Sequence, residues 1–391
     1  MSSFFQGFLS TSDVLEVFSE RSFLAALLRF EASLARAQAS AGLIPEAAAQ
    51  SIIGTCKIEL FDVAKIVRES ARAGDMVTPL VKSLGETVGL FNQEAASFVH
   101  FGSTSQEAID TALALVTRHA LSLIEADVRQ AVAVLLALAE RHAADPVLER
   151  TLMQPASATS FGLLCAAWAA PLVRSLQRLQ VSGGNALCLQ WGGAVGMLAP
   201  MKGRGPEVMA CMAADLQLKA PLFGGPTQRD EWAALGCELG LLVGNLGKVA
   251  KDIARMSQYE AGELFEPSAP GRGGASAMPH TRTPRACMTA LAASARAPLR
   301  VAALLAAMPQ AHERALGHWQ AELAEWPELL VSAHGSARAM ARALAGLQVD
   351  TQRMRANLEG LGAGWPPALA GQAAELTRGQ VKALTALATL D

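Results

Sequence analysis

The sequence predicts an all-α protein with a long five-helix central bundle and small helical domains at both ends. Residues that favour helices are abundant in the long segments, whereas Tyr occurs once and alternating β-branched runs are scarce. Neither Gly nor Pro interrupts residues 103–145, where apolar residues recur at helical spacing. A second proline-free segment, 228–263, carries four glycines on one face.

The first 95 residues are expected to form the N-terminal helical domain. They contain a periodic segment over 22–41, and Gly42 and Pro45 follow it as a helix terminator. We therefore predict a helix over 22–41, accompanied by shorter helices.

Residues 96–347 are assigned to the central bundle. A helix through 103–145 would be roughly 55–60 Å long at 1.5 Å per residue, so it needs partners of similar length. The predicted partners span 156–181, 228–263, 284–308 and 310–347, with Pro298 and Pro327 interrupting the last two. The glycine stripe (Gly236, Gly240, Gly244 and Gly247) predicts very close helix–helix approach, because each glycine costs about 1 kcal/mol of helix propensity.

Residues 348–391 are predicted to form a short C-terminal helical domain. Asp350 and Thr351 are typical of an N-cap, so a further short helix is expected to begin there.

Composition excludes several classes of function. The net charge of −2 provides no basic field for nucleic acid. The six cysteines are scattered, with no CxxC or Cys/His ligand spacing, so reduced core thiols are favoured over a metal or redox site and no cofactor is expected. The N-terminus lacks the pattern of a signal peptide, which indicates a cytoplasmic protein.

Two uncharged stretches, 151–173 and 181–201, are long enough to cross a membrane. The first contains two prolines and several polar residues, and the second is broken by five glycines. Buried bundle segments explain both better, so no membrane partner is expected.

The segment 271–284, Gly-Arg-Gly-Gly-Ala-Ser-Ala-Met-Pro-His-Thr-Arg-Thr-Pro, predicts a flexible loop that feeds a helix. Its glycines disfavour a helix, while Thr283 is placed to cap the next helix and Pro284 to open it. Such a loop offers free backbone N–H groups to an anion and can close as a lid. The alternative is an ordinary glycine-rich linker.

This segment resembles the signature loop of the fumarase/aspartase superfamily, Gly-Ser-Ser-x-Met-Pro-x-Lys-x-Asn-Pro. Residues 102–111, Gly-Ser-Thr-Ser-Gln-Glu-Ala-Ile-Asp-Thr, are similar to the family's Gly-x-Thr-Ser-Gln-Asp-x-x-Asp-Thr, and 150–156 are similar to its Arg-Thr-x-x-Gln-x-Ala. The similarity continues to about residue 358. The form Met-Pro-His-x-Arg resembles the adenylosuccinate lyase and carboxymuconate cycloisomerase branches of the superfamily. Residues 30–39 and 310–319 most resemble bacterial 3-carboxy-cis,cis-muconate cycloisomerases.

The resemblance implies the L-aspartase-like fold and a homotetramer whose active sites are each assembled from three subunits. It implies lactonisation of 3-carboxy-cis,cis-muconate, a small polycarboxylate, to 4-carboxymuconolactone in the protocatechuate branch of the β-ketoadipate pathway. A carboxylate of the substrate adds to its own double bond, so neither a metal nor an external nucleophile is required. The protein must hold the anion, stabilise the enolate and deliver one proton.

The resemblance also implies the site residues. Substrate binding is expected from the three matching segments and three further residues: Ser103, Thr104, Ser105, Gln106, Thr151, Gln154, Gln228, Arg229, Gly273, Gly274, Met278 and Arg314. For Thr104, Ser105 and Gln106, capping of the long helix is an additional or alternative role. For Arg314 the alternative is an exposed bundle arginine.

The catalytic residues are expected on the loop, where the sequence departs from the family pattern. Ala275 stands at the position of the family's catalytic serine and Thr281 at that of its lysine. The remaining polar groups, Ser276, His280 and Arg282, are therefore the predicted proton donor or enolate stabilisers, with His280 suited to an acid by its ordinary pKa near 6.5. Alternatively, His280 only fixes the loop.

Three hypotheses of function stay open on the sequence. The first is an active 3-carboxymuconate cycloisomerase. The second is a related lyase or cycloisomerase acting on another polyanion, of the adenylosuccinate or sulfomuconate type. The third is a catalytically silent scaffold, favoured by the altered loop, whereas the intact Met278 and Pro279 favour the first.

Overall fold

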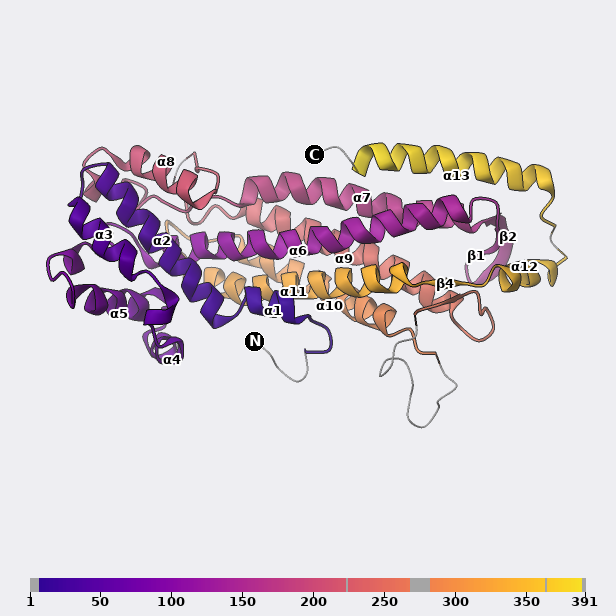
Figure 1. Ribbon diagram of the computed structural model, residues 1–391, viewed down its shortest axis with the longest axis horizontal. Helices are drawn as coiled ribbons and strands as arrows, with labels where there is room; N and C mark the ends of the chain where they lie inside the picture. The colour runs from indigo at the N-terminus through magenta and orange to yellow at the C-terminus, as the bar shows by residue number, and fades with distance from the viewer. Residues whose placement is uncertain (1–6, 223, 268–281, 363, 389–391) are drawn as a thin grey trace.

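The computed structural model describes residues 7–222, 224–267, 282–362 and 364–388. Five long helices run lengthwise beside one another and form the body of the molecule (Figure 1): α6 (Ser105–Arg141), α7 (Phe161–Ala186), α9 (Asp230–Met256), α10 (Arg285–Ala307) and α11 (His318–Ala345). The predicted all-α bundle is confirmed. The 37 residues of α6 correspond to about 55 Å of helix.

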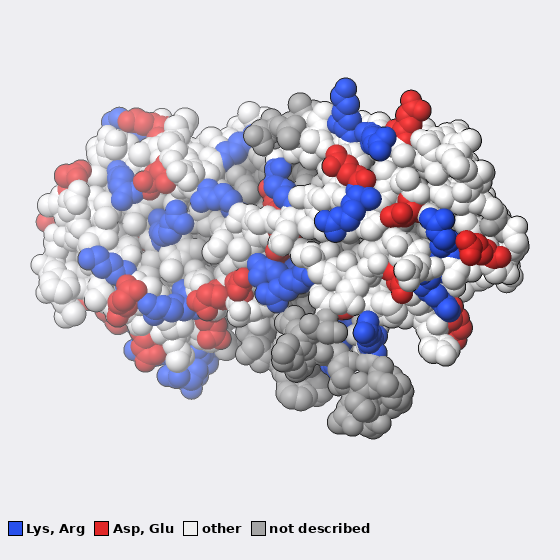
Figure 2. Space-filling view, turned by 45° about the vertical axis from the view of Figure 1, so that its right-hand side comes forward, with Lys and Arg blue, Asp and Glu red and all other residues white. Residues whose placement is uncertain are grey.

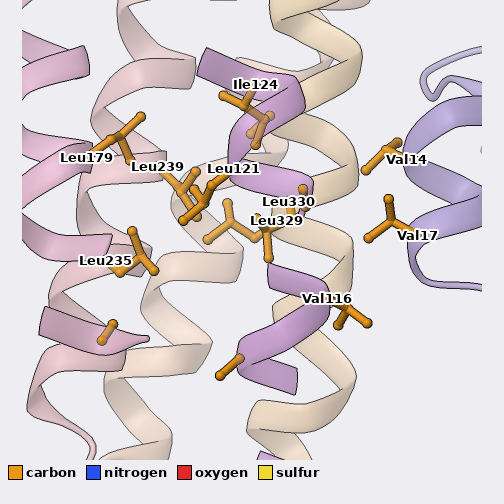
Figure 3. Close-up of a cluster of buried hydrophobic side chains, with 14 of the residues drawn as sticks. Val14, Val17, Val116, Leu121, Ile124, Leu179, Leu235, Leu239, Leu329 and Leu330 are labelled. Carbon is orange, nitrogen blue, oxygen red and sulfur yellow. The ribbon is translucent and has the colours of Figure 1, made fainter. Parts of the chain in front are cut away.

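The core of the bundle is a continuous set of apolar side chains at helical spacing. In Figure 3, side chains from α6, α7, α9 and α11 meet along the axis, and those of α1 (Ser12–Val17) close one side. The labelled members are Val14, Val17, Val116, Leu121, Ile124, Leu179, Leu235, Leu239, Leu329 and Leu330. Their burial supplies the main driving force for assembling the bundle.

The observed boundaries differ from the prediction at several helices, and α9 ends at Met256 rather than at 263. Helix α7 begins at Phe161, because an antiparallel hairpin of β1 (Pro146–Thr151) and β2 (Gln154–Ser160) precedes it, and this hairpin was not predicted. Helix α11 begins only at His318, after a non-helical segment over 308–317.

The expected interruptions at two prolines are wrong. Pro298 lies inside α10 and Pro327 lies inside α11, and both helices continue through them. A proline removes one backbone donor. Packing of these long helices against their neighbours outweighs that local cost.

The glycine stripe lies where α9 meets α10. A Cβ added at Gly236 would lie 2.8 Å from Leu304, one at Gly240 would lie 2.7 Å from Val301, and one at Gly247 would lie 2.5 Å from Ser294. Three of the four glycines therefore permit the close approach that was predicted. At Gly244, by contrast, a Cβ would meet no atom within 4 Å.

Shorter helices gather at the end of the bundle where α6 begins (Figure 1). Helix α2 (Glu20–Ser40) packs on α6, and α8 (Gly205–Leu216) packs on α2. The others here are α3 (Glu46–Thr55), η1 (Ile58–Leu60), α4 (Val63–Ala73), α5 (Val77–Gly89), η2 (Ala95–Phe98) and η3 (Ala199–Met201). The boundary predicted near residue 95 stays a prediction.

The C-terminal segment returns along the bundle. Strand β4 (Gln348–Val349) pairs with β3 (Leu264–Phe265), and α12 (Thr351–Glu359) follows at the far end. Helix α13 (Pro367–Ala388) then lies lengthwise on α7 (Figure 1), with Val381 and Leu384 buried.

Helices α9 and α10 are long and apolar enough to cross a membrane by length and composition. Helix α9 is mostly buried inside the bundle, and α10 carries Arg296 and Arg300, which pair with Glu328 and Glu325 of α11. These contacts favour bundle helices. On the face in Figure 2, charges of both signs are interspersed rather than gathered in one field.

Candidate active site

A pocket of about 550 Å³ opens at the N-terminus of α6. Helix α4, the turn before α5, the first turns of α6 and the segment leading into α11 contribute its walls. Its polar lining includes Asp75, Thr104, Ser105, Gln106 and Arg314. Four of the predicted substrate-binding residues are thus neighbours here.

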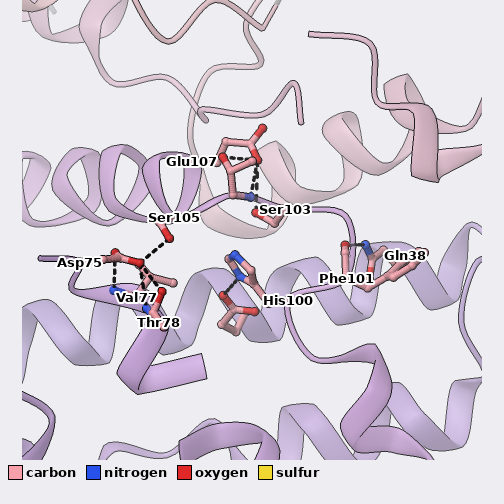
Figure 4. A network of polar contacts seen from close by, with 11 residues as sticks. Gln38, Asp75, Val77, Thr78, His100, Phe101, Ser103, Ser105 and Glu107 are labelled. Carbon is pink, nitrogen blue, oxygen red and sulfur yellow. Dashed lines mark hydrogen bonds and ion pairs between the residues drawn. The ribbon is translucent and has the colours of Figure 1, made fainter. Parts of the chain in front are cut away.

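The start of α6 is fixed by the buried carboxylate of Glu107. Its Oε2 accepts hydrogen bonds from the backbone N–H of Thr104 (2.9 Å), the Thr104 hydroxyl (3.0 Å) and the Ser103 hydroxyl (3.3 Å), as Figure 4 shows. Its Oε1 accepts from the backbone N–H groups of Gly192 and Gly193. The capping role considered for Thr104 is therefore present in the structure.

Asp75 is the second carboxylate beside the pocket. Its side chain accepts from the Ser105 hydroxyl (2.8 Å) and from the backbone N–H groups of Val77 and Thr78 (3.0 and 3.2 Å). Burial alone would raise the pKa of Asp75, but the hydrogen bonds from Thr78, Val77 and Ser105 together hold it below its usual value. Asp75 is therefore ionised near neutral pH.

These contacts change what the three predicted hydroxyls can do. Ser103 and Thr104 donate their protons to Glu107, and Ser105 donates to Asp75. Since a hydroxyl has only one proton, none of the three can also donate to a bound carboxylate in this arrangement. Their part is to shape the pocket rather than to bind an anion through their hydroxyl groups.

Among the predicted residues in the pocket, Gln106 and Arg314 are left to hold an anion. Arg314 Nη1 donates to Gln106 Oε1 (3.1 Å), while Nη2 donates to Gly193 O (2.9 Å) and Nε to Ala194 O (3.3 Å). Gln106 Nε2 is buried and has no hydrogen-bond partner within the part of the chain that the structure describes. An unpaired buried amide is costly, so a hydrogen bond from this donor to a ligand would offset that cost. The N-terminus of a 37-residue helix adds a positive dipole end.

Arg229 has a different role from the predicted one. Its side chain is 2% exposed and forms ion pairs with Asp110 (2.9 Å) and Glu322 (3.0 Å through Nε). Burial would lower the pKa of Arg229, but the two carboxylates raise it instead. Asp110 also accepts from the indole N–H of Trp319 (2.9 Å), which lines the pocket. Arg229 therefore supports the pocket wall from behind and presents no surface to substrate.

The remaining predicted residues do not join this pocket. Gln228 is exposed on the loop before α9. Thr151 and Gln154 are exposed and pair with each other at the turn of the β1–β2 hairpin, at the opposite end of the bundle (Figure 1). Arg282 lies near that far end, where its guanidinium covers the Phe265 ring at 5.0 Å and donates to Gln348 (3.4 Å).

The other predicted loop residues lie outside the described residues. They are Gly273, Gly274, Ser276, Met278 and His280. Because α6, about 55 Å long, separates the pocket from the hairpin, one chain does not bring the two groups of predicted residues together.

In strand β1 of the hairpin, Arg150 forms a bidentate pair with the fully buried Glu263 (3.0 and 2.9 Å). Asn357 of α12 donates to the same carboxylate at 2.8 Å. The hairpin is thus anchored to the end of the bundle and to the C-terminal segment. The turn itself exposes Leu152 and Met153, which are 96% and 66% exposed.

One polar group behind the pocket, His100, was not predicted from the sequence. Its Nδ1 lies 2.6 Å from Oε1 of the buried Glu31, and its backbone has a positive φ of 58° (Figure 4). Burial would lower the pKa of His100, but the negative charges of Glu31, Glu107 and Asp75 raise it. The available signal was its place two residues before Gly102, at the start of a matching segment.

Within the described ranges, no group of three or more His, Cys, Asp or Glu side chains is arranged to hold an ion. Burial raises the pKa of the Cys165 thiol, and burial together with the nearby Glu266 carboxylate raises that of Cys287, so both are poor nucleophiles.

Comparison with known proteins places this geometry in a family. A model of the lyase family matches residues 9–299. The chain belongs to the fumarase/aspartase superfamily of lyases. The 3-carboxy-cis,cis-muconate cycloisomerase of Pseudomonas putida is 41% identical over 355 residues, covering 91% of this chain and 84% of the relative. That of Pseudomonas aeruginosa is 42% identical and covers 90% and 77%, respectively.

Solved structures agree with this membership. The 3-carboxy-cis,cis-muconate lactonizing enzyme of Pseudomonas putida superposes with a TM-score of 0.87 at 38% identity, covering 98% of this chain and 88% of that one. A fumarate lyase from Mesorhizobium gives a TM-score of 0.81 at 30% identity, covering 97% and 87%. Enzymes of this superfamily act on small polycarboxylates, which suits the cationic and amide donors of the Arg314 pocket.

Proposed function

We propose that this lyase-superfamily enzyme is a cytoplasmic 3-carboxy-cis,cis-muconate cycloisomerase that forms 4-carboxymuconolactone. The observation that carries the proposal is the Arg314 pocket, which the side chains of Arg314 and Gln106 line at the N-terminus of α6. Relatives at 41% and 42% identity bear that name.

The pocket suits this chemistry because the substrate brings its own nucleophile. One carboxylate of the bound anion attacks the conjugated double bond and forms the C–O bond of the lactone. The electron pair of the double bond moves towards the neighbouring carboxylate as an enolate, and a proton is added at the adjacent carbon. Arg314 and Gln106 would hold a carboxylate in the folded geometry, which lowers the entropic part of the barrier.

We assign the roles of proton donor and enolate stabiliser to the loop residues Ser276, His280 and Arg282. We expect wild-type enzyme to consume 3-carboxy-cis,cis-muconate rapidly. Ser276→Ala or His280→Ala should lower kcat by about 10²-fold, as is common for loss of an acid or a preorganised donor. Loss of the diene absorbance measures turnover, and circular dichroism checks that folding is retained.

Two outcomes would contradict this assignment. Full activity in both single variants would exclude these side chains from the chemistry. A slow wild type that gains activity in Ala275→Ser with Thr281→Lys would show instead that the loop has lost its chemistry. Parallel assays with adenylosuccinate and with a sulfonated muconate test the other polyanion hypothesis.

The proposal includes a homotetramer with shared active sites. Its first support is the separation of the two groups of predicted residues at opposite ends of α6. The second is an exposed apolar stripe on α10, where Met288, Ala295 and Ala302 are seven residues apart, as are Leu299 and Ala306. Leu299 is 71% exposed, and a seven-residue apolar repeat is typical of helices that pack on other helices.

We expect wild type to have about four times the 40.9 kDa mass of one chain by light scattering. Leu299→Glu with Ala302→Glu should give smaller species, because buried unpaired charges cost several kcal/mol per ion. Activity should fall with assembly. Leu376→Glu, on an exposed site of α13, is the matched control and should leave the mass unchanged. A monomeric wild type, or a stripe variant of unchanged mass, would refute the assembly.

A further inference from the structure

Glu107 joins two segments that are 85 residues apart in the chain. Its carboxylate is 1% exposed and accepts from Ser103 and Thr104 on one side and from the backbone N–H groups of Gly192 and Gly193 on the other. Five donors on one carboxylate exceed what a helix cap needs, since the cap uses only the donors of Thr104. The contacts with Gly192 and Gly193 are therefore additional to the helix cap.

The segment that Glu107 holds is also the one that positions Arg314. Carbonyl groups of Gly193 and Ala194 accept from Nη2 and Nε of the guanidinium at 2.9 and 3.3 Å. Gly193 has a φ of +70°, and a Cβ at Gly192 would lie 2.9 Å from the Cα of Gly224. This backbone is thus closely packed on one side and held by Glu107 on the other.

Consecutive residues thus link the carboxylate to the guanidinium. The N–H of Gly193 points to Glu107 while its C=O points to Arg314, so displacement of one displaces the other. Charge-assisted hydrogen bonds are short and strong, which makes this a stiff connection. Gln106 completes it, because it precedes Glu107 in the chain and accepts from Arg314 Nη1.

We propose that Glu107 is a positioning residue that holds Arg314 in the orientation needed to bind a substrate carboxylate, acting through the backbone of residues 192–194. The identity of the substrate in this inference rests on the proposed function. The mechanical coupling of Glu107 to Arg314 is independent of the proposed function.

The test uses Glu107→Asp, which keeps the charge and shortens the side chain by one methylene, and Glu107→Gln, which removes the charge. The shorter carboxylate can reach Thr104 or the glycine pair but not both. We expect KM for 3-carboxy-cis,cis-muconate to rise about tenfold or more in each variant while kcat changes little. This pattern is expected when an interaction that binds the substrate and the transition state equally well is lost. In an Arg314→Ala background, Glu107→Asp should add almost nothing, since the two residues act as one unit.

A second readout needs no turnover. Hydrogen exchange in peptides spanning 187–198 should be faster in Glu107→Asp than in wild type, because the carboxylate protects the N–H groups of Gly192 and Gly193. Calorimetric affinity for propane-1,2,3-tricarboxylate should fall in the same variant. If wild type does not convert 3-carboxymuconate, the proposed function fails, while these two measurements still decide the coupling.

Asp127→Asn is the matched control. Asp127 is a buried carboxylate on the same helix and binds an arginine of α11, Arg338, at 2.8 and 2.7 Å, remote from the pocket. Its loss should lower thermal stability without raising KM. Unchanged KM and unchanged exchange over 187–198 in Glu107→Asp, or an effect that adds fully to that of Arg314→Ala, would overturn the proposal.

Discussion

Replacing Arg229 by methionine is expected to lower the free energy of unfolding by about 3–5 kcal/mol. The substitution leaves Asp110 and Glu322, which are 2% and 3% exposed, as buried carboxylates without their cation. It also removes the ion pair that fixes Asp110, whose carboxylate accepts the hydrogen bond from the Trp319 indole. Thermal unfolding at one fixed protein concentration measures the change, because assembly would otherwise shift the melting temperature.

The matched control is Arg21→Ala, which removes an ion pair with Glu59 whose side chains are 53% and 68% exposed. Such a pair contributes about 0–1 kcal/mol, so this variant should melt close to wild type. Restored stability in a variant that also carries Asp110→Asn and Glu322→Gln would identify unpaired charge as the cause. A methionine variant as stable as wild type would contradict the buried ion pair.

Arg314→Ala should lower kcat/KM for 3-carboxy-cis,cis-muconate by about 10²-fold or more, equivalent to about 3 kcal/mol. The reason is that the guanidinium lines the pocket and, under the proposed function, pairs with a carboxylate of the substrate. Arg314→Lys should recover only part of the loss, because an ammonium cannot contact Gln106, Gly193 and Ala194 in one plane. Steady-state kinetics with melting temperatures measures both effects.

Arg118→Ala provides the comparison for Arg314. Arg118 also donates to two backbone carbonyls, those of Leu216 and Gln217 at 3.1 and 2.5 Å, and it is absent from the pocket lining. We expect its kcat/KM to stay within about threefold of wild type, as for an exposed contact. Equal losses in the two variants would mean that Arg314 acts through folding rather than through substrate.

The parts of the fold that sequence periodicity determines were predictable. The unbroken segment 103–145 contains the observed α6, Ser105–Arg141, and three stripe glycines face α10 at the close distances that their position suggested. Both features are local in sequence. A repeat of 3.6 residues or a row of glycines is visible without knowledge of the partner.

Features that depend on distant partners were not predictable. The turn of the β1–β2 hairpin uses Leu152 and Met153 at φ of 51° and 67°, where glycine or asparagine is usual, so no turn signal marked it. A proline inside a helix usually interrupts it. Helices α10 and α11 continue through Pro298 and Pro327 because neighbouring helices pack against them.

The candidate site shows the same division. Arg314, Thr104 and Gln106 could be named because they lie in segments that resemble a family. The burial of Arg229 could not, since Asp110 and Glu322 are 119 and 93 residues away in the chain. Likewise, the pairing of His100 with Glu31 joins residues 69 apart, and a single sequence contains no record of such contacts.

The length of helix α6 also fixes the distance between the two ends of the molecule. With the Arg314 pocket at its first turn and the hairpin just beyond its last, its 37 residues set the spacing between the two ends of the molecule. Every inserted residue would lengthen this spacing by about 1.5 Å and rotate the far end by about 100°. The length of α6 therefore helps to determine the geometry of any active site that combines the pocket of one copy with the hairpin of another. This holds even for outward-facing residues of α6 that contact neither the pocket nor the hairpin.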